Sequence, residues 1–99
     1  MNRAKKIKLI SEEFEPDSIG QMIPTEKETE IWAMVRDVSA TESERPVEGL
    51  RPSKVFDVLV TEYSDEENVE YKGVRYRIYR TYLRDDSKVE LYGGVRVGQ

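Results

Sequence analysis

Three pairs of adjacent carboxylates are the side chains of this sequence best suited to acid–base or metal chemistry: Glu12-Glu13, Glu66-Glu67 and Asp85-Asp86. Two carboxylates catalyse proton transfer when a cleft holds their pKa values apart, whereas each of these pairs falls in a predicted turn or loop. The run Asp65-Glu66-Glu67-Asn68 offers oxygen ligands for calcium but lacks the ligand spacing of a known calcium-binding loop. We therefore expect solvated turns at these positions, and we predict no catalytic residue, no cofactor site and no metal site.

Two residue types that carry much enzymatic and metal chemistry are missing. The 99 residues include no histidine and no cysteine, which excludes Ser-His-Asp sites, ordinary zinc and haem sites, and disulfides. Gly93-Gly94 has neither the spacing nor the following helix of a phosphate-binding loop. The sequence therefore predicts a protein without enzymatic activity.

Arginine and tyrosine alternate between residues 75 and 82, a pattern that can hold single-stranded nucleic acid by charge and base stacking. The net charge of −4 opposes binding by phosphate neutralisation. A protein interface explains the pattern better, since both residue types are enriched at interfaces. The candidate interface residues are Trp32, Arg75, Arg77, Tyr79, Arg80 and Tyr82. For Trp32, the chain's only tryptophan, the first interpretation is a partly buried anchor against the sheet, and a partner-facing position is the second.

Charge is distributed in blocks along the chain. Residues 1–10 contain four basic residues and no acid, whereas residues 11–30 contain seven acids against Lys27 alone. Each block is typical of a solvated face. Blocks of opposite sign on one small domain also suit head-to-tail contacts between copies.

The elements that position these residues are predicted from apolar periodicity. Alternation with a period of two indicates strands, which we expect at 7–10 (as an edge strand), 28–38, 54–62, 69–72, 74–83, 88–92 and 95–97. Turns are expected at Pro24-Thr25 and at Lys72-Gly73, where glycine supplies a positive φ, and Gly93-Gly94 is expected to end a strand.

These elements predict a mostly β fold: a small β-barrel of five to seven short antiparallel strands, with one short helix or long loop near residues 39–52. We expect residues 1–99 to form a single domain in which 1–6 and 98–99 are flexible. The basic start leads into no apolar signal-peptide region, and no stretch has the length of a membrane span, so we expect a cytoplasm-like location.

Several segments resemble the head-closure proteins of tailed bacteriophages, also called head-tail joining or stopper proteins. Residues Val69–Ile78 are similar to that family's "strand, Lys-Gly, Tyr-x-Ile" hairpin, and Tyr79–Tyr82 and Val89–Tyr92 resemble its closing strands. Asp17–Gln21 followed by Thr29–Val35 resembles its opening, a "D-x-x-G" turn and then a strand. The resemblance covers about residues 7 to 97.

The resemblance implies a structural virion protein, from a phage or a prophage. Such proteins assemble as a ring, generally dodecameric, under the portal and adaptor, close the DNA channel after packaging and offer a docking surface to a tail-completion protein. It implies a ring on the virion and passing contact with DNA. Because closing a ring needs neighbours and a template, we expect a monomer in isolation, and we expect no contact with membrane. The protein would be found in the host cytoplasm during assembly and then in the virion neck.

The resemblance also implies a channel-facing loop, which falls within the segment 39–52. Its candidate residues are Thr41, Glu42, Ser43, Glu44, Arg45, Pro46, Val47, Glu48 and Gly49. Two alternatives stay open: another phage neck or tail-terminator protein, and a small-barrel nucleic-acid binding module.

Overall fold

The computed structural model describes residues 3–39 and 49–97, and these residues form six strands and one turn of 3₁₀ helix. In chain order they are β1 (Lys5–Pro16), β2 (Met22–Asp37), β3 (Leu50–Leu59), η1 (Val60–Glu62), β4 (Asn68–Tyr71), β5 (Val74–Leu83) and β6 (Lys88–Arg96). All pairings are antiparallel, and the strands close in the order β1-β2-β3-β6-β5-β4. The predicted class, a small and mostly β barrel, is confirmed.

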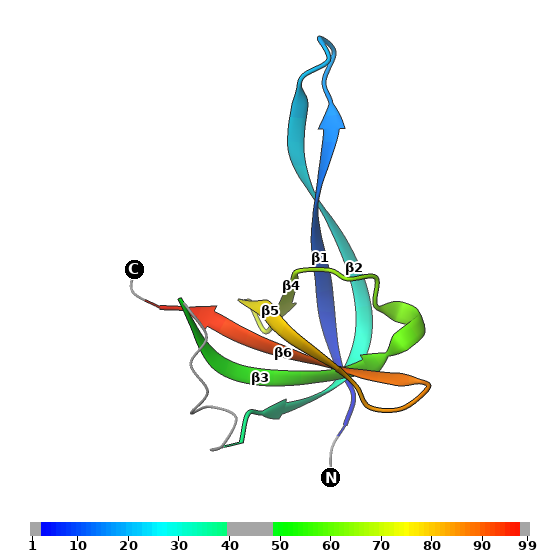
Figure 1. Ribbon diagram of the computed structural model, residues 1–99, viewed down its shortest axis with the longest axis vertical. Coiled ribbons are helices and arrows are strands. Elements are labelled where there is room, and N and C mark those ends of the chain that lie inside the picture. The colour runs from blue at the N-terminus through cyan, green and yellow to red at the C-terminus, as the bar shows by residue number, and fades with distance from the viewer. Residues whose placement is uncertain (1–2, 40–48, 98–99) are drawn as a thin grey trace.

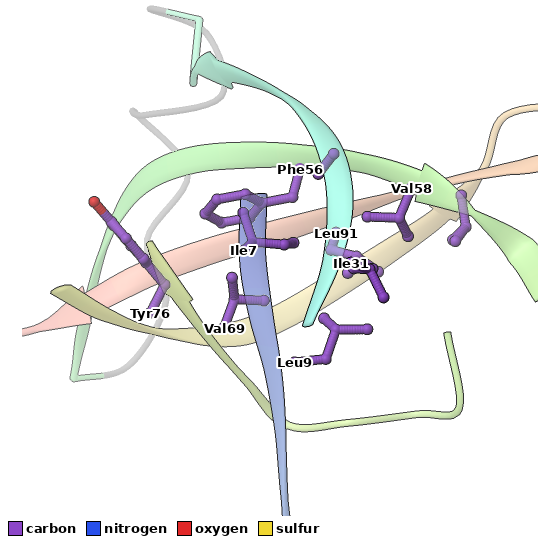
Figure 2. Packing of buried hydrophobic residues seen from close by; sticks show 10 residues of the cluster. Ile7, Leu9, Ile31, Phe56, Val58, Val69, Tyr76 and Leu91 are labelled. Carbon is purple, nitrogen blue, oxygen red and sulfur yellow. The ribbon is translucent and has the colours of Figure 1, made fainter. Parts of the chain in front are cut away.

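The barrel interior is filled by side chains that alternate along the strands, as the pleat of a strand requires. Figure 2 shows this cluster, whose labelled members are Ile7, Leu9, Ile31, Phe56, Val58, Val69, Tyr76 and Leu91. The Phe56 ring is fully buried and meets the rings of Tyr71 and Tyr76 edge-on, with centroids 6.0 and 5.5 Å apart. Every strand contributes to this one small core.

β1 and β2 continue beyond the barrel as a two-stranded ribbon, residues 11–27, which we call the arm (Figure 1). The ladder between β1 and β2 runs from Lys5 opposite Ala33 to Pro16 opposite Met22. β4 pairs with β1 only at residues 8–10, so the arm has no third strand. It projects along the longest dimension of the molecule, whose extents are 51 × 33 × 24 Å.

The start of the chain differs from the sequence-based expectation. Ile7–Ile10 is not an edge strand, because β1 is paired on one side with β2 and on the other with β4. Lys5 and Lys6, expected to be flexible, belong to β1. Pro24-Thr25 is not a turn but lies within β2, because an arm strand has one free edge at which a proline lacking an N–H is tolerated.

Two further expectations are corrected in the second half of the chain. Gly93-Gly94 does not end β6, which runs through both glycines as far as Arg96. Leu50–Pro52, assigned to the long loop, instead begins β3. Among the described residues the only helical turn is η1; the short helix or long loop expected near 39–52 falls mainly on residues 40–48, which lie outside the described part, and stays a prediction.

The hairpin between β4 and β5 matches its prediction closely. Lys72 and Gly73 both have positive φ, 52° and 78°, as a tight two-residue turn of the primed type requires. β5 spans Val74–Leu83, the predicted range. Local turn chemistry and alternation were sufficient here, since both signals lie within a dozen residues.

Candidate functional site

The arm carries an exposed apolar surface on one of its two faces. Directly paired residues in an antiparallel ladder project to the same face, and residues two apart along a strand share that face. Phe14 is opposite Pro24 and Pro16 is opposite Met22, so these four side chains lie together. Phe14 and Met22 are 58% and 59% exposed. We call this set of four residues the apolar arm face.

The two prolines indicate how this surface could be used. Proline lacks the N–H that a ladder needs, so it fits a ribbon only where its nitrogen points away from the partner strand. Pro16 therefore blunts the outer edge of β1, and Pro24 blunts the outer edge of β2. Each edge of the arm therefore lacks one backbone N–H donor, which disfavours pairing with an added strand. The arm is thus suited to contact through its face.

The turn at the end of the arm is held by one carboxylate. Asp17 Oδ1 accepts hydrogen bonds from the backbone N–H groups of Ile19 (2.9 Å) and Gln21 (2.8 Å). The Asp17 N–H donates to the Gln21 carbonyl at 2.8 Å, and Gly20 adopts a φ of 88°. This ordered turn presents Ile19, which is 77% exposed, beside the apolar arm face.

The remainder of the arm is acidic, with five carboxylates against one lysine. Glu12 and Glu26 are directly opposite, and a like-charge pair in that arrangement is destabilising. Arg75 of β5 offsets this repulsion, because its Nη1 and Nη2 donate to the two Glu26 carboxylate oxygens at 2.8 and 3.1 Å. The hydrogen bonds lower the pKa of Glu26 and raise the pKa of Arg75. Arg75 thereby ties the base of the arm to the barrel.

A second exposed surface lies on the barrel wall, where β2 and β3 separate. Their ladder ends at Met34 opposite Asp57, although the same register would bring Trp32 opposite Leu59. Both side chains point outward, 58% and 46% exposed, and line a shallow groove.

Two lysines flank this apolar pair. Lys6 is opposite Trp32 on β1, with its Nζ 5.2 Å from the indole ring centroid, and Lys88 is opposite Leu59 on β6. Across four strands the outward row is Lys6, Trp32, Leu59 and Lys88, which we call the Trp32 row. Trp32 is therefore more than half exposed on an outward face, and its role towards a partner stays a prediction.

The remaining predicted interface residues, on β5, do not form a continuous platform. A register shift between Ile78 and Arg80 interrupts the alternation, so that Tyr79 and Arg80 lie beside Tyr92 of β6. The Tyr79 and Tyr92 rings are 6.3 Å apart, and the Arg80 guanidinium lies 5.0 Å from the Tyr92 ring. Because a bulge re-aims side chains, strict alternation could not have placed these residues.

The three other members of that set differ in their surroundings. Arg75 is engaged with Glu26, whereas Arg77 and Tyr82 are exposed. The structure therefore does not bring the six predicted residues together in one surface.

The carboxylate pairs have structural partners. Glu66 Oε1 accepts from the Ser64 N–H at 2.7 Å, and Glu67 Oε2 accepts from the Glu12 N–H at 3.1 Å. Asp85 Oδ1 accepts from the Ser87 N–H and hydroxyl, which lowers the pKa of Asp85. Within residues 3–39 and 49–97, no three acidic side chains converge as a metal site would require.

The predicted channel loop falls mainly outside the described residues. Of its nine residues only Gly49 is described: it has a φ of 73°, and its carbonyl accepts from the Val97 N–H at 3.2 Å. The assignment of Thr41–Glu48 to the channel stays a prediction. In the described parts of the chain, no helix has the length and apolar character needed to span a membrane.

The apolar arm face was missed in the sequence because residues 12–17 read as an acidic loop. The signal that could have revealed it is the turn Asp17–Gln21: in a hairpin centred on Ile19, Phe14 must face Pro24 and Pro16 must face Met22. Comparison of this chain with known proteins found no matching family model, curated relative or solved structure.

Proposed function

We propose that this chain is a non-enzymatic assembly protein, and that it serves as the head-closure protein of a tailed phage or prophage. In that role it forms a ring under the portal and adaptor, closes the DNA channel and receives the tail. The observation that carries the assembly role is the projecting arm with an exposed apolar face. The phage setting rests on the sequence resemblance, whose hairpin and "D-x-x-G" segments correspond to the turns at Lys72-Gly73 and Asp17–Gly20.

An exposed apolar face on a projecting element favours a docking role because it is costly to leave in water. Soluble monomers rarely expose contiguous apolar patches larger than about a few hundred Å², and patches of that size often mark interaction sites. Phe14 and Met22 make no contribution to the barrel core, which is built from other residues. Their solvent-exposed position is therefore explained by a contact outside this molecule.

The size of the arm surface suits assembly on a template. Fully burying a side chain such as Phe, Ile or Met contributes about 1.5–3 kcal/mol. For Phe14, Ile19 and Met22, scaled by their exposed fractions of 58%, 77% and 59%, this amounts to about 3–6 kcal/mol. A receiving surface of equal area would about double that figure, while association costs about 4–15 kcal/mol. One contact therefore leaves little net affinity, and we expect a monomer until a connector aligns many copies.

The test is size-exclusion chromatography with light scattering, on the chain alone and mixed with the cognate portal–adaptor complex. The proposal expects a monomer alone and co-elution as a ring with the complex. A matched pair of variants sharpens it: Phe14→Ser/Met22→Ser should lose co-elution, whereas Val74→Ser/Leu83→Ser, at exposed apolar positions outside the arm, should retain it.

Failure to bind the connector would overturn the head-closure proposal. Binding to a tail tube instead would identify a tail-terminator protein, and a salt-dependent shift of a labelled oligonucleotide would identify a nucleic-acid module.

A further inference from the structure

From the two exposed surfaces we infer that the apolar arm face of one copy docks on the Trp32 row of the next copy. This inference rests on the proposed ring assembly and names the contact that builds it. The contact is heterologous, since two unlike surfaces of the same chain meet, and such contacts repeat head to tail into rings.

The arm cannot reach the Trp32 row of its own chain. Met22 begins β2 and Trp32 lies ten residues further along the same strand, a span of about 33 Å. In Figure 1 the arm turn and the beginning of β1, which carries Lys6, lie at opposite ends of the long axis. The partner that fills the groove must therefore come from another molecule.

The two surfaces are complementary in polarity and in charge. The apolar arm face is bounded towards the barrel by Glu12 and Glu26, while the apolar pair of the Trp32 row is bounded by Lys6 and Lys88. With the arm laid along the row, Phe14 and Met22 cover the apolar pair, and Glu12 at the barrel end of the apolar arm face approaches one of the two lysines, while Glu26 stays paired with Arg75. Opposite flanks of this kind set the register of a contact and guide its formation.

Other charged groups near the row leave this complementarity in place. A Glu30 carboxylate oxygen lies 3.5 Å from Lys6 Nζ. This ion pair is exposed to solvent and therefore contributes little stabilisation. Asp57 and Glu62 also line the groove, and Asp57 is paired with Arg84. The arm as a whole carries five carboxylates against one lysine, so it is attracted to the lysines of the row, and the Glu12 carboxylate, which borders the apolar arm face, has no ion-pair partner among the described residues.

The absence of cysteine from the sequence allows a direct test by disulfide trapping. One preparation carries Met22→Cys and a second carries Leu59→Cys, and the two are mixed under mild oxidation with and without the portal–adaptor complex. A disulfide forms only where Cα atoms approach within about 7 Å. With the complex present we expect a cross-link about tenfold faster than in the control pair, because docking raises the local concentration.

The control pair is Met22→Cys with Val74→Cys. Val74 is 42% exposed, close to the 46% of Leu59, but lies in the β4–β5 hairpin. Circular dichroism of each variant verifies that it folds. In a further variant, Lys88→Glu is added to the Leu59→Cys copy. This substitution reverses the charge at one end of the Trp32 row and should slow the cross-link.

The outcomes separate the two proposals. If the variants bind the connector yet the test and control pairs react equally, the arm contact is wrong and head closure survives. If the arm cysteine instead cross-links to a connector protein, the partner is not a second copy. If neither the parent chain nor any variant binds the connector, the head-closure proposal fails. The contact between copies is then tested at high protein concentration without the connector. A faster cross-link in the Met22–Leu59 cysteine pair than in the control pair supports the contact, and equal rates refute it.

Discussion

Replacement of Gly93 by alanine is a direct test of how tightly the barrel closes across β5 and β6. A Cβ atom at this position would lie 3.0 Å from Tyr76 Cβ and 3.1 Å from Phe56 Cε2. Carbon atoms attract best at about 3.5–4.0 Å, so both side chains must move. Both are buried, and their rings already pack edge-to-face, which leaves them little room.

The expected loss follows from two opposing effects. Adding a methyl group to a well-packed core costs about 1–3 kcal/mol. Alanine also reduces the conformational freedom of the unfolded chain, which stabilises the folded protein by about 0.4–1 kcal/mol where alanine can adopt the native backbone conformation. This condition is met at Gly93, which is not among the described glycines with positive φ. The net loss in the free energy of unfolding is about 1–2 kcal/mol, which corresponds to a fall in Tm of roughly 4–16 °C.

Thermal and urea denaturation followed by circular dichroism measure this loss. The matched experiment is a double-mutant cycle with Phe56→Leu, which removes the ring atom that the new methyl group meets. We expect the Gly93→Ala penalty to shrink in the Phe56→Leu background. An unchanged Tm for Gly93→Ala alone, or the same penalty in both backgrounds, would refute the packing argument.

Three further outcomes concern the arm and the acidic turn. Asp17→Ala removes the acceptor of two hydrogen bonds, worth about 1 kcal/mol each. Amide hydrogen exchange should accelerate within the arm while the Tm of the barrel changes little. Faster exchange throughout the barrel would contradict this. The hydrogen bonds from Arg75 lower the pKa of Glu26 from 4.5. The ion pair therefore stabilises the folded protein above pH 4.5, and this stabilisation is lost as the pH falls through the pKa of Glu26 in the folded state. Arg75→Ala should therefore reduce the loss of unfolding free energy at acid pH. Identical profiles of unfolding free energy against pH for the parent and the variant would argue against a stabilising Glu26–Arg75 pair. Burial and nearby carboxylates raise the pKa of Tyr63 from 10.0 to about 12, so the corresponding stability is complete below pH 10 and declines towards pH 12. An absorbance titration of the phenols should show one late component that Tyr63→Phe lacks, and its persistence in the variant would exclude Tyr63 as the source.

The β4–β5 hairpin shows what could be predicted from residues alone. The run Val74–Leu83 alternates, and Lys72-Gly73 supplies the turn chemistry, so both the strand and its boundary were readable. These signals act over a few residues and depend little on the rest of the chain. The candidate interface residues were less predictable, because the bulge between Ile78 and Arg80 is imposed by pairing with β6.

The arm shows the opposite case. Residues 12–16 contain three glutamates and a proline, a composition with low strand propensity. They are nevertheless extended, because β1 pairs with β2 along its full length. Gly93-Gly94 was likewise expected to end a strand, but the close approach of Phe56, Tyr76 and Arg51 favours residues without a Cβ there.

From the sequence alone the mostly β class could be predicted, whereas the absence of enzymatic activity and the role in protein contacts stay predictions, and Glu12-Glu13, expected in a turn, lies within β1. The sequence also indicated the central parts of the barrel strands, since the period of two is a local property, although it missed the arm strands and placed Val60–Glu62, a 3₁₀ turn, in a strand. Only the tertiary structure decided which side chains share a surface. Phe14 meets Pro24, and Trp32 lies in one row with Leu59, because strand register joins residues distant in the chain. Register depends on the pairing of whole strands, and a shift of one residue would turn each side chain to the opposite face.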